Sequence, residues 1–286
     1  ISSDMLVQGR HFFADVDPRT LGHKALAVNL SDLAACGAKP LAFTLALSLP
    51  EADDAWLAPF SQGLLALADA HGCELIGGDT TAGPLNICVT VFGEVPVVNG
   101  RSQALLRSGA KPGDDLYVSG TIGDARLALE GLLGQLTVPT EILTLARTRL
   151  ECPTPRVALG LALRGVASAA IDLSDGLLGD LGHILEGSQV GATVHADIAI
   201  QSIATYADQS SATSPFDLNL SIEQWRTLAL AGGDDYELLF TAPGHLRDAV
   251  EAAAHLSQTP VRCIGQIDAA PGLRLLDNAG RPIVKS

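Results

Sequence analysis

The chain has 286 residues, 47% of them hydrophobic, and a formal net charge of −14. This length allows one large domain or two ordinary ones, each with a packed core. The acidic balance argues against a nucleic-acid partner, because no basic stripe offsets phosphate charge. No apolar run reaches the roughly 18 residues of a membrane-spanning helix, so we expect no membrane partner. The five cysteines form no CxxC pair and predict neither disulfides nor a zinc site, which favours the cytoplasm.

The acidity also bears on ligand chemistry. An acidic protein that handles nucleotides needs metal cations between its carboxylates and the phosphates. Acidity that serves only solubility is the simpler explanation, and composition alone favours it. The chain lacks the G-x-x-x-x-G-K-[ST] loop and the HRD and DFG motifs, which excludes the Walker-type and protein-kinase folds.

The first hundred residues predict a mixed α/β region. The expected strands are residues 1–7, 41–49, 74–76 and 86–95, and the expected helices are residues 17–36 and 52–70. Asp17 and Pro18 give the first helix an N-cap and a proline at its first position, and Gly37 follows its end. Because the chain begins inside an expected strand, we expect further residues before Ile1.

A polar stretch over residues 99–113 separates two domains. We place the boundary near Ser108, which gives α/β domains over residues 1–108 and 109–286. The second domain predicts strands at 116–119, 169–173, 236–241 and 261–267, helices at 124–133, 156–166, 176–186, 223–231 and 245–255, a loop at 148–155 and a mobile connection at 202–214.

Oxygen-bearing side chains recur in the first domain. Ser2, Ser3 and Asp4 offer the oxygen ligands that Mg²⁺ prefers. A polar strand-to-loop transition explains them as well, and this segment alone favours that explanation. Asp32 lies inside the first helix among apolar residues, where a buried carboxylate needs Lys24 or a metal as its partner. An exposed Asp32 needs neither, and the sequence leaves both possibilities open.

Two further segments combine carboxylates with small residues. Gly78 and Asp79 follow a short strand, so backbone N–H groups can face a phosphate while the carboxylate holds a metal. A tight turn is the alternative, and we slightly favour function. Asp172 and Asp175 bracket Ser174 where a strand meets a helix, and a helix N-terminus suits phosphate. Ser174 as a simple N-cap is the alternative, but paired carboxylates exceed what capping needs.

The ordered set of segments resembles the thiamine-monophosphate kinase family, within the aminoimidazole ribonucleotide synthetase superfamily. The matching segments are residues 1–7, 9–12, 27–34, 75–81, 107–114, 171–177 and 232–238. The resemblance implies an N-terminal sheet that forms a barrel across a homodimer, packed against a C-terminal α/β domain. It implies direct in-line transfer of the γ-phosphoryl of ATP to thiamine monophosphate, with several Mg²⁺ ions, giving thiamine diphosphate.

The resemblance also implies roles for individual residues. The implied Mg²⁺ ligands are Ser2, Ser3, Asp4, Asp32, Asp79, Asp172 and Asp175. The implied ATP contacts are Gly78, Asp79, Arg107 and Ser174, and the implied substrate contacts are His11 and Asp234. Ser3 stands where the family commonly has Thr, and Asp234 where Glu is usual, which shortens its reach. The family's Gly-Asp-Asp-Ala segment and its C-terminal aromatic residue have no counterpart between Ile1 and Ser286, and we expect them outside the chain.

Three other functions fit parts of this pattern. A sister enzyme of the superfamily, such as selenophosphate synthetase or a hydrogenase-maturation protein, shares the implied fold. A metal-dependent phosphohydrolase also uses clustered Asp residues. A non-catalytic nucleotide-binding subunit would bind ATP without turnover. Formation of ADP and thiamine diphosphate in equal amounts distinguishes the kinase from all three.

Overall fold

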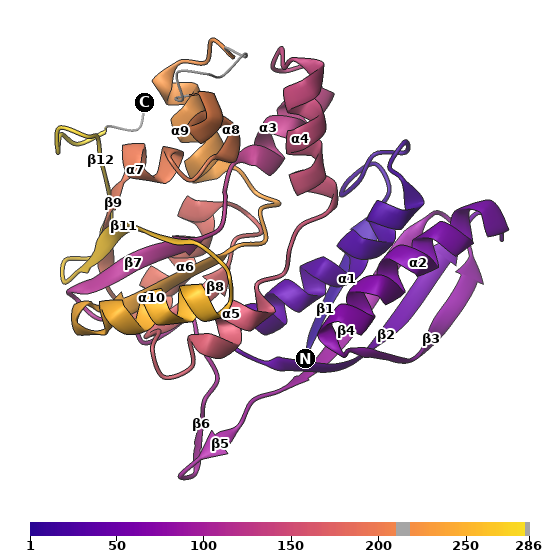
Figure 1. Ribbon diagram of the computed structural model, residues 1–286, viewed down its shortest axis with the longest axis horizontal. Coiled ribbons are helices and arrows are strands. Elements are labelled where there is room, and N and C mark those ends of the chain that lie inside the picture. The colour runs from indigo at the N-terminus through magenta and orange to yellow at the C-terminus, as the bar shows by residue number, and fades with distance from the viewer. Residues whose placement is uncertain (210–217, 284–286) are drawn as a thin grey trace.

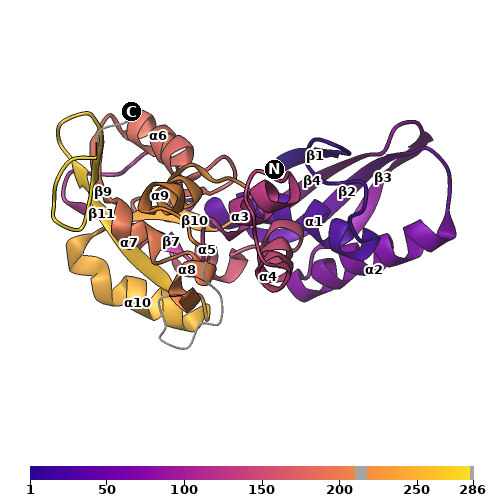
Figure 2. The same cartoon turned by 90° about the horizontal axis from the view of Figure 1, so that it is seen from above.

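Two β-sheets, each with helices packed on it, organise the chain into two α/β domains (Figure 1). The computed structural model describes residues 1–209 and 218–283. The N-terminal sheet has four strands in the order β1-β4-β2-β3, which are β1 (Ser2–Val7), β4 (Asn86–Glu94), β2 (Lys39–Leu49) and β3 (Glu74–Ala82). Two helices, α1 (Pro18–Ala35) and α2 (Asp54–His71), pack on this sheet. Figure 2 shows both helices on the same side of it.

Local signals set the ends of these two helices. The Asp17 side chain accepts the N–H of Arg19 at 2.7 Å, and Asp53 caps α2 in the same way through Ala55 at 2.9 Å. Gly72 ends α2 in a left-handed conformation with a φ of 58°. The mixed α/β prediction for this region is therefore confirmed.

The opposite face of the N-terminal sheet is uncovered. Along β4, Ile87, Val89 and Val91 are buried towards the helices, whereas the residues between them are only half-buried. No helix in the described ranges covers that second face (Figure 2). The edge strand β3 is exposed along its whole length. Within one chain the sheet is therefore open and forms no closed barrel.

The C-terminal domain is built on six strands in the order β12-β9-β11-β7-β10-β8. Their bounds are β12 (Gly272–Leu276), β9 (Gly191–His195), β11 (Val261–Asp268), β7 (Asp114–Ser119), β10 (Leu238–Pro243) and β8 (Ala169–Asp172). The helices are α3 (Asp124–Leu132), α4 (Thr140–Glu151), α5 (Val157–Ala162), α6 (Leu177–Ser188), α7 (Ala196–Ile200), α8 (Ala204–Gln209), α9 (Ile222–Ala231) and α10 (Arg247–Leu256), with a 3-10 turn at Gly244–Leu246. A small hairpin of β5 (Val97–Val98) and β6 (Arg101–Ser102) precedes them. No helix in the described residues is long and apolar enough to span a membrane.

One hydrophobic core runs through both domains. Phe240 of β10 and Leu159 of α5 belong to the same buried cluster as Leu30 of α1 and Phe43 of β2. The other face of the C-terminal sheet packs a second cluster with α3, α4, α6, α7 and α9. Because α1 lies in the first cluster and contacts α5, burial of apolar surface holds the two domains together.

Several predicted elements need correction. Residues 148–151 are not a loop, because α4 continues to Glu151 through an Arg147–Glu151 ion pair. The predicted strand at 74–76 extends to Ala82, since β3 pairs with β2 along its length. β9, β12 and α7 were not predicted. Residues 204–209 of the predicted mobile connection are helical, and residues 210–214 lie outside the described residues. The boundary near Ser108 stays a prediction.

The crossing of α1 and α2 gives a first testable prediction. A Cβ atom on Gly22 would lie 2.0 Å from the carbonyl oxygen of Phe60, which is backbone and cannot give way. We expect Gly22→Ala to lower the free energy of unfolding by about 1–3 kcal/mol or more, as measured in urea. Gly182→Ala is the matched control, because this exposed helical glycine has no neighbour within 4 Å. Gly182→Ala should raise the free energy of unfolding by up to about 1 kcal/mol. An equal decrease in both variants would contradict the close packing of α1 on α2 at Gly22.

Candidate active site

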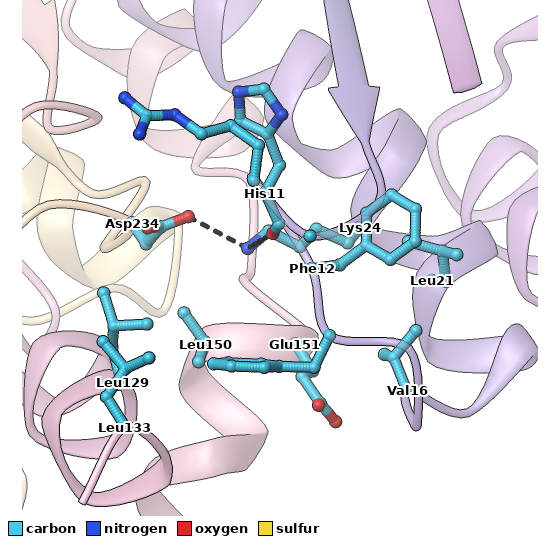
Figure 3. Close-up of a pocket in the computed structure, with 13 residues that line it drawn as sticks. His11, Phe12, Val16, Leu21, Lys24, Leu129, Leu133, Leu150, Glu151 and Asp234 are labelled. Atoms are coloured by element: carbon cyan, nitrogen blue, oxygen red, sulfur yellow. Dashed lines mark hydrogen bonds and ion pairs between the residues drawn. The ribbon is translucent and has the colours of Figure 1, made fainter. Parts of the chain in front are cut away.

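Two adjoining cavities lie where the domains meet. The larger, of about 610 Å³, is lined by Asp4 and His11 from the N-terminal domain and by Ser174, Asp175 and Asp234 from the C-terminal domain. The smaller, of about 280 Å³, shares His11 and Asp234 with it and is otherwise mostly apolar (Figure 3). Five residues predicted for the site are therefore brought to one place.

Three carboxylates converge behind the larger cavity, at Asp4, Asp32 and Asp172. Asp32 of α1 accepts the Ser2 hydroxyl at 2.6 Å, and Asp172 at the end of β8 accepts the Ser31 hydroxyl at 2.8 Å. The hydroxyls of Ser2 and Ser31 thus each donate to one carboxylate of the cluster. The position of Asp32 is thus half-buried and inside the site, and not on an outer helix face.

The carboxylates destabilise each other's charged forms. Burial, and then the charge of Asp32, raise the pKa of Asp172 to about 7. Burial, the charge of Asp32 and a hydrogen bond to it raise the pKa of Asp4 to about 6. Burial raises the pKa of the Tyr236 hydroxyl, and Asp234, Asp4, Asp172 and Asp32 add to that shift. A cation placed among these groups would relieve the repulsion.

The donor set fits a hard divalent cation. Carboxylate and hydroxyl oxygens are the ligands of Mg²⁺, which uses one or two carboxylates and completes its shell with water and phosphate. Within residues 1–209 and 218–283, no three Asp, Glu, His or Cys side chains are close enough together to ligate one ion. The chain therefore supplies only part of the coordination shell of each ion, and the oxygens of a phosphate ligand would supply the remainder.

Arg107, Asp32 and Asp172 all act electrostatically on the thiol of Cys36. Burial is the main cause that raises the pKa of the Cys36 thiol, Asp32 and Asp172 also raise it, and Arg107 lowers it. Arg107 itself is exposed in the segment between β6 and β7. Its guanidinium is therefore open to solvent, and its contact with ATP stays a prediction.

The start of α6 differs from expectation. The backbone N–H groups of Ser174, Asp175 and Gly176 all donate to Asp180 Oδ2 at 3.1 Å. Asp180 lies in the first turn of the helix and neutralises its positive end from within. The predicted free N–H groups are therefore occupied, and Ser174 is not the N-cap, which is Gly176. The Ser174 side chain and the exposed Asp175 still line the larger cavity.

Gly78 and Asp79 lie away from the other predicted ligands within the chain. Asp4, Val89, Leu45 and Gly78 are successive partners across the sheet, so three strand spacings of about 4.8 Å separate Asp4 from Gly78 by about 14 Å. Asp79 opens on the uncovered face, as does Ser3, which bonds to Thr90 at 2.9 Å. The tight turn that the sequence left as an alternative is absent, because both residues lie inside β3.

Gly78 has a structural reason to be glycine. Its φ is +152°, and a Cβ would lie 1.8 Å from the carbonyl oxygen of Leu45 in the neighbouring strand. Strand pairing therefore requires glycine at this position whether or not a phosphate approaches it.

The smaller cavity combines an apolar wall with a buried ion pair. Leu129, Leu133 and Leu150 line one side of it, and Lys24 meets Asp234 across the domain boundary at 2.9 Å (Figure 3). The exposed His11 accepts the Val7 N–H at its Nδ1. Lys24, which the sequence offered as a partner for Asp32, is therefore paired with Asp234.

The sequence did not predict Tyr236 or Arg126 at the site, and it assigned Lys24 a different partner. Tyr236 and Arg126 line the larger cavity, and Lys24 lines the smaller one. Tyr236 belongs to a matching segment and has a φ of 50°, which is rare for an aromatic residue. Nothing in the sequence around Arg126 distinguishes it from an exposed helical residue.

The raised pKa of Asp172 predicts a pH-dependent stability. Its carboxyl stays protonated in the folded chain up to about pH 7 but ionises near 3.8 when unfolded, so folding stability is lost as pH rises through this window. Asp172→Asn removes this loss and keeps an acceptor for Ser31. In metal-free buffer, its stability advantage over the wild type should grow by on the order of 2 kcal/mol from about pH 5 to about pH 8. Glu51→Gln, an exposed loop control, should show no growth. A pH-independent difference for Asp172→Asn would contradict this origin.

Family models match both domains of the chain. The AIR synthase related protein N-terminal domain matches residues 1–95, and the corresponding C-terminal domain matches residues 111–278. Both cavities are lined by residues from each of these two ranges.

Individual relatives narrow the family. The chain is 48% identical over 273 residues to thiamine-monophosphate kinase of Salmonella typhimurium, covering 94% of this chain and 78% of that protein. The crystal structure of thiamine-monophosphate kinase from Stenotrophomonas maltophilia is 45% identical, has a TM-score of 0.84, and aligns with 96% of this chain and 84% of its own. AaThiL complexed with AMPPCP and TMP is 27% identical, has a TM-score of 0.78, and aligns with 100% of this chain and 84% of its own. By sequence and by structure, the chain belongs to the thiamine-monophosphate kinase family of AIR synthase-related proteins.

Proposed function

We propose that this protein transfers the γ-phosphoryl of ATP to the phosphate of thiamine monophosphate, forming ADP and thiamine diphosphate. The observation that carries the proposal is the convergence of Asp4, Asp32 and Asp172 beside two joined cavities, one polar and one mostly apolar. A relative solved with AMPPCP and TMP shares this fold. We place the enzyme in the cytoplasm, because all five cysteines are free.

The two cavities suit the two substrates. The larger has room for a nucleoside triphosphate beside the carboxylates, and it is lined by Arg126, whose guanidinium pairs with Glu130 at 2.8 Å. The apolar wall of the smaller suits the aromatic rings of the acceptor. Because Arg10, His11 and Asp234 line both cavities, the two phosphates would meet at these residues. That arrangement supports in-line transfer by positioning.

We propose that several Mg²⁺ ions bind here, with Asp4, Asp32, Asp172, Asp175 and the hydroxyl of Ser2 each supplying part of a coordination shell that phosphate oxygens and water complete. Bound Mg²⁺ neutralises charge on the transferring phosphoryl group and on the phosphates beside it. The chain's own residues keep these carboxylates oriented, through Ser2 on Asp32 and Ser31 on Asp172. The acceptor is a phosphate that is already ionised, so no strong general base is needed.

We further propose a homodimer built on the uncovered face and edge of the N-terminal sheet. The edge strand β3 is exposed along all nine residues, and Met5 and Ile76 are 54% and 61% exposed. Exposed edges and apolar groups of this kind favour pairing with a second chain. Ser3, Gly78 and Asp79 open on this surface, so a second copy completes the metal and ATP contacts that the resemblance assigns to them.

The enzymatic proposal is tested by product analysis. Protein, Mg²⁺, ATP and thiamine monophosphate should yield ADP and thiamine diphosphate in equal amounts. Phosphate release without thiamine diphosphate would support a phosphohydrolase instead, and ATP binding without turnover would support a nucleotide-binding subunit. Either result contradicts the proposal.

The homodimer is tested by mixing inactive subunits. Asp32→Asn and Asp79→Asn should each lower kcat by at least about 100-fold, because each removes a charge that offsets phosphate. If the two residues serve one site from different subunits, a co-expressed mixture contains mixed dimers with one intact site. Such a mixture should recover about a quarter of wild-type activity.

The control is co-expression of Asp79→Asn with Glu51→Gln, in which both subunits keep Asp32. It measures how far inactive Asp79→Asn subunits lower the activity by simple dilution. Activity of the Asp32/Asp79 mixture no higher than that of the separate variants would place both residues in one subunit's site. A monomer in sedimentation at micromolar concentration would reject the homodimer.

A further inference from the structure

Lys24 is a buried cation at the floor of the smaller cavity. Its side chain is 3% exposed, and its ammonium donates to Asp234 Oδ1 at 2.9 Å and, more weakly, to the His11 carbonyl at 3.5 Å. Figure 3 shows both contacts converging on the Lys24 nitrogen. A buried ammonium is costly without an anionic partner, so the pair with Asp234 holds both side chains in place.

Asp234 is held at the point where the cavities join. It lines both of them, and its side chain is 34% exposed. Its backbone has a φ of +66°, unusual for a residue other than glycine, and its N–H donates to the Ser174 carbonyl at 2.9 Å. Within the described parts of the chain, its second oxygen, Oδ2, makes no hydrogen bond or ion pair. One oxygen is therefore fixed by Lys24, and the other is available to a ligand.

The location creates an electrostatic difficulty that Lys24 resolves. An ionised carboxylate at the junction repels the phosphate of an acceptor bound in the smaller cavity. The Lys24 ammonium offsets that charge at 2.9 Å while leaving Oδ2 free to accept a hydrogen bond. Because Lys24 belongs to α1 and Asp234 to the C-terminal domain, the pair also fixes the cavity across the domain boundary.

We infer that Lys24 is a positioning residue that sets affinity for the phosphorylated acceptor through Asp234, and not affinity for ATP. The inference rests on the proposed function for the identity of the acceptor. Lys24 lines the smaller cavity, whereas the carboxylate cluster and the Arg126 guanidinium line or adjoin the larger one. Removing the ammonium leaves the Asp234 carboxylate unpaired and free to turn. Thiamine monophosphate then meets a carboxylate oxygen that is out of place and a negative charge that nothing offsets.

Steady-state kinetics of matched variants tests the inference. Lys24→Met should raise KM for thiamine monophosphate by at least about 10-fold and leave KM for ATP within about 2-fold. Lys24→Arg keeps the charge and should recover most of the loss. Lys39→Met is the control, because Lys39 also pairs with a carboxylate, Glu94 at 3.7 Å, but is 64% exposed. It should behave as the wild type.

A second variant covers the case in which Lys24→Met fails to fold. Asp234→Asn removes the other charge of the pair, and it should weaken binding of thiamine monophosphate in calorimetry without ATP. Because the two residues act as a unit, the double variant should lose little more than either single one. Equal changes in the two KM values, or unchanged KM values with lower melting temperatures, would overturn the inference. A wild-type protein that forms no thiamine diphosphate would instead overturn the proposed function.

Discussion

The crowding of Asp4, Asp32 and Asp172 at the domain boundary is the constraint on which the site depends. Burial and mutual repulsion raise the pKa of Asp172 to about 7 and that of Asp4 to about 6. Such an arrangement lowers the stability of the ligand-free protein near neutral pH. This cost to stability is explained if the three carboxylates hold cations against phosphate. Part of the net charge of −14 then serves ligand binding.

Helix α1 carries this constraint between the two domains. Lys24, Val28, Ser31 and Asp32 follow one another at helical spacing, so one stripe of the helix faces the cavities. From that stripe Lys24 reaches Asp234, and Ser31 reaches Asp172, both in the C-terminal domain. The other sides of α1 pack apolar residues against β4, α2 and α5. The hydrophobic core thereby fixes the geometry of the polar site.

Local sequence signals predicted the elements whose causes are local. Asp17 and Gly37 mark the ends of α1, and the strand expected at residues 86–95 is found as β4. β9 and β12 were missed, because β12 pairs with β9, and β9 also pairs with β11, in each case with a partner far along the chain. The loop predicted at residues 148–155 begins too early, because the Arg147–Glu151 ion pair within α4 extends the helix.

The sequence predicted which types of residue form the site better than it predicted how they are arranged. The paired carboxylates around Ser174 pointed to ion binding, whereas the sequence left Asp32 open between a buried and an exposed position. The Lys24–Asp234 pair joins residues 210 positions apart, so no local pattern reveals it. The same holds for Asp180, whose carboxylate occupies the N–H groups expected to face phosphate. Asp79 illustrates the opposite case, because the sequence pattern predicts a ligand there, whereas the structure places it on a surface that a single chain leaves open.

The central claim is that the carboxylate cluster binds cation and nucleotide together. The most direct measurement is the melting temperature of the wild type and of Asp32→Asn with Mg²⁺, with a non-hydrolysable ATP analogue, and with both. A ligand at about 100 times its dissociation constant stabilises the folded state by about 2.7 kcal/mol, so the shifts are readily measured. The account predicts that both additions together raise the wild-type melting temperature well beyond the sum of the separate shifts, and that Asp32→Asn loses most of this excess. An excess that persists unchanged in Asp32→Asn would contradict it.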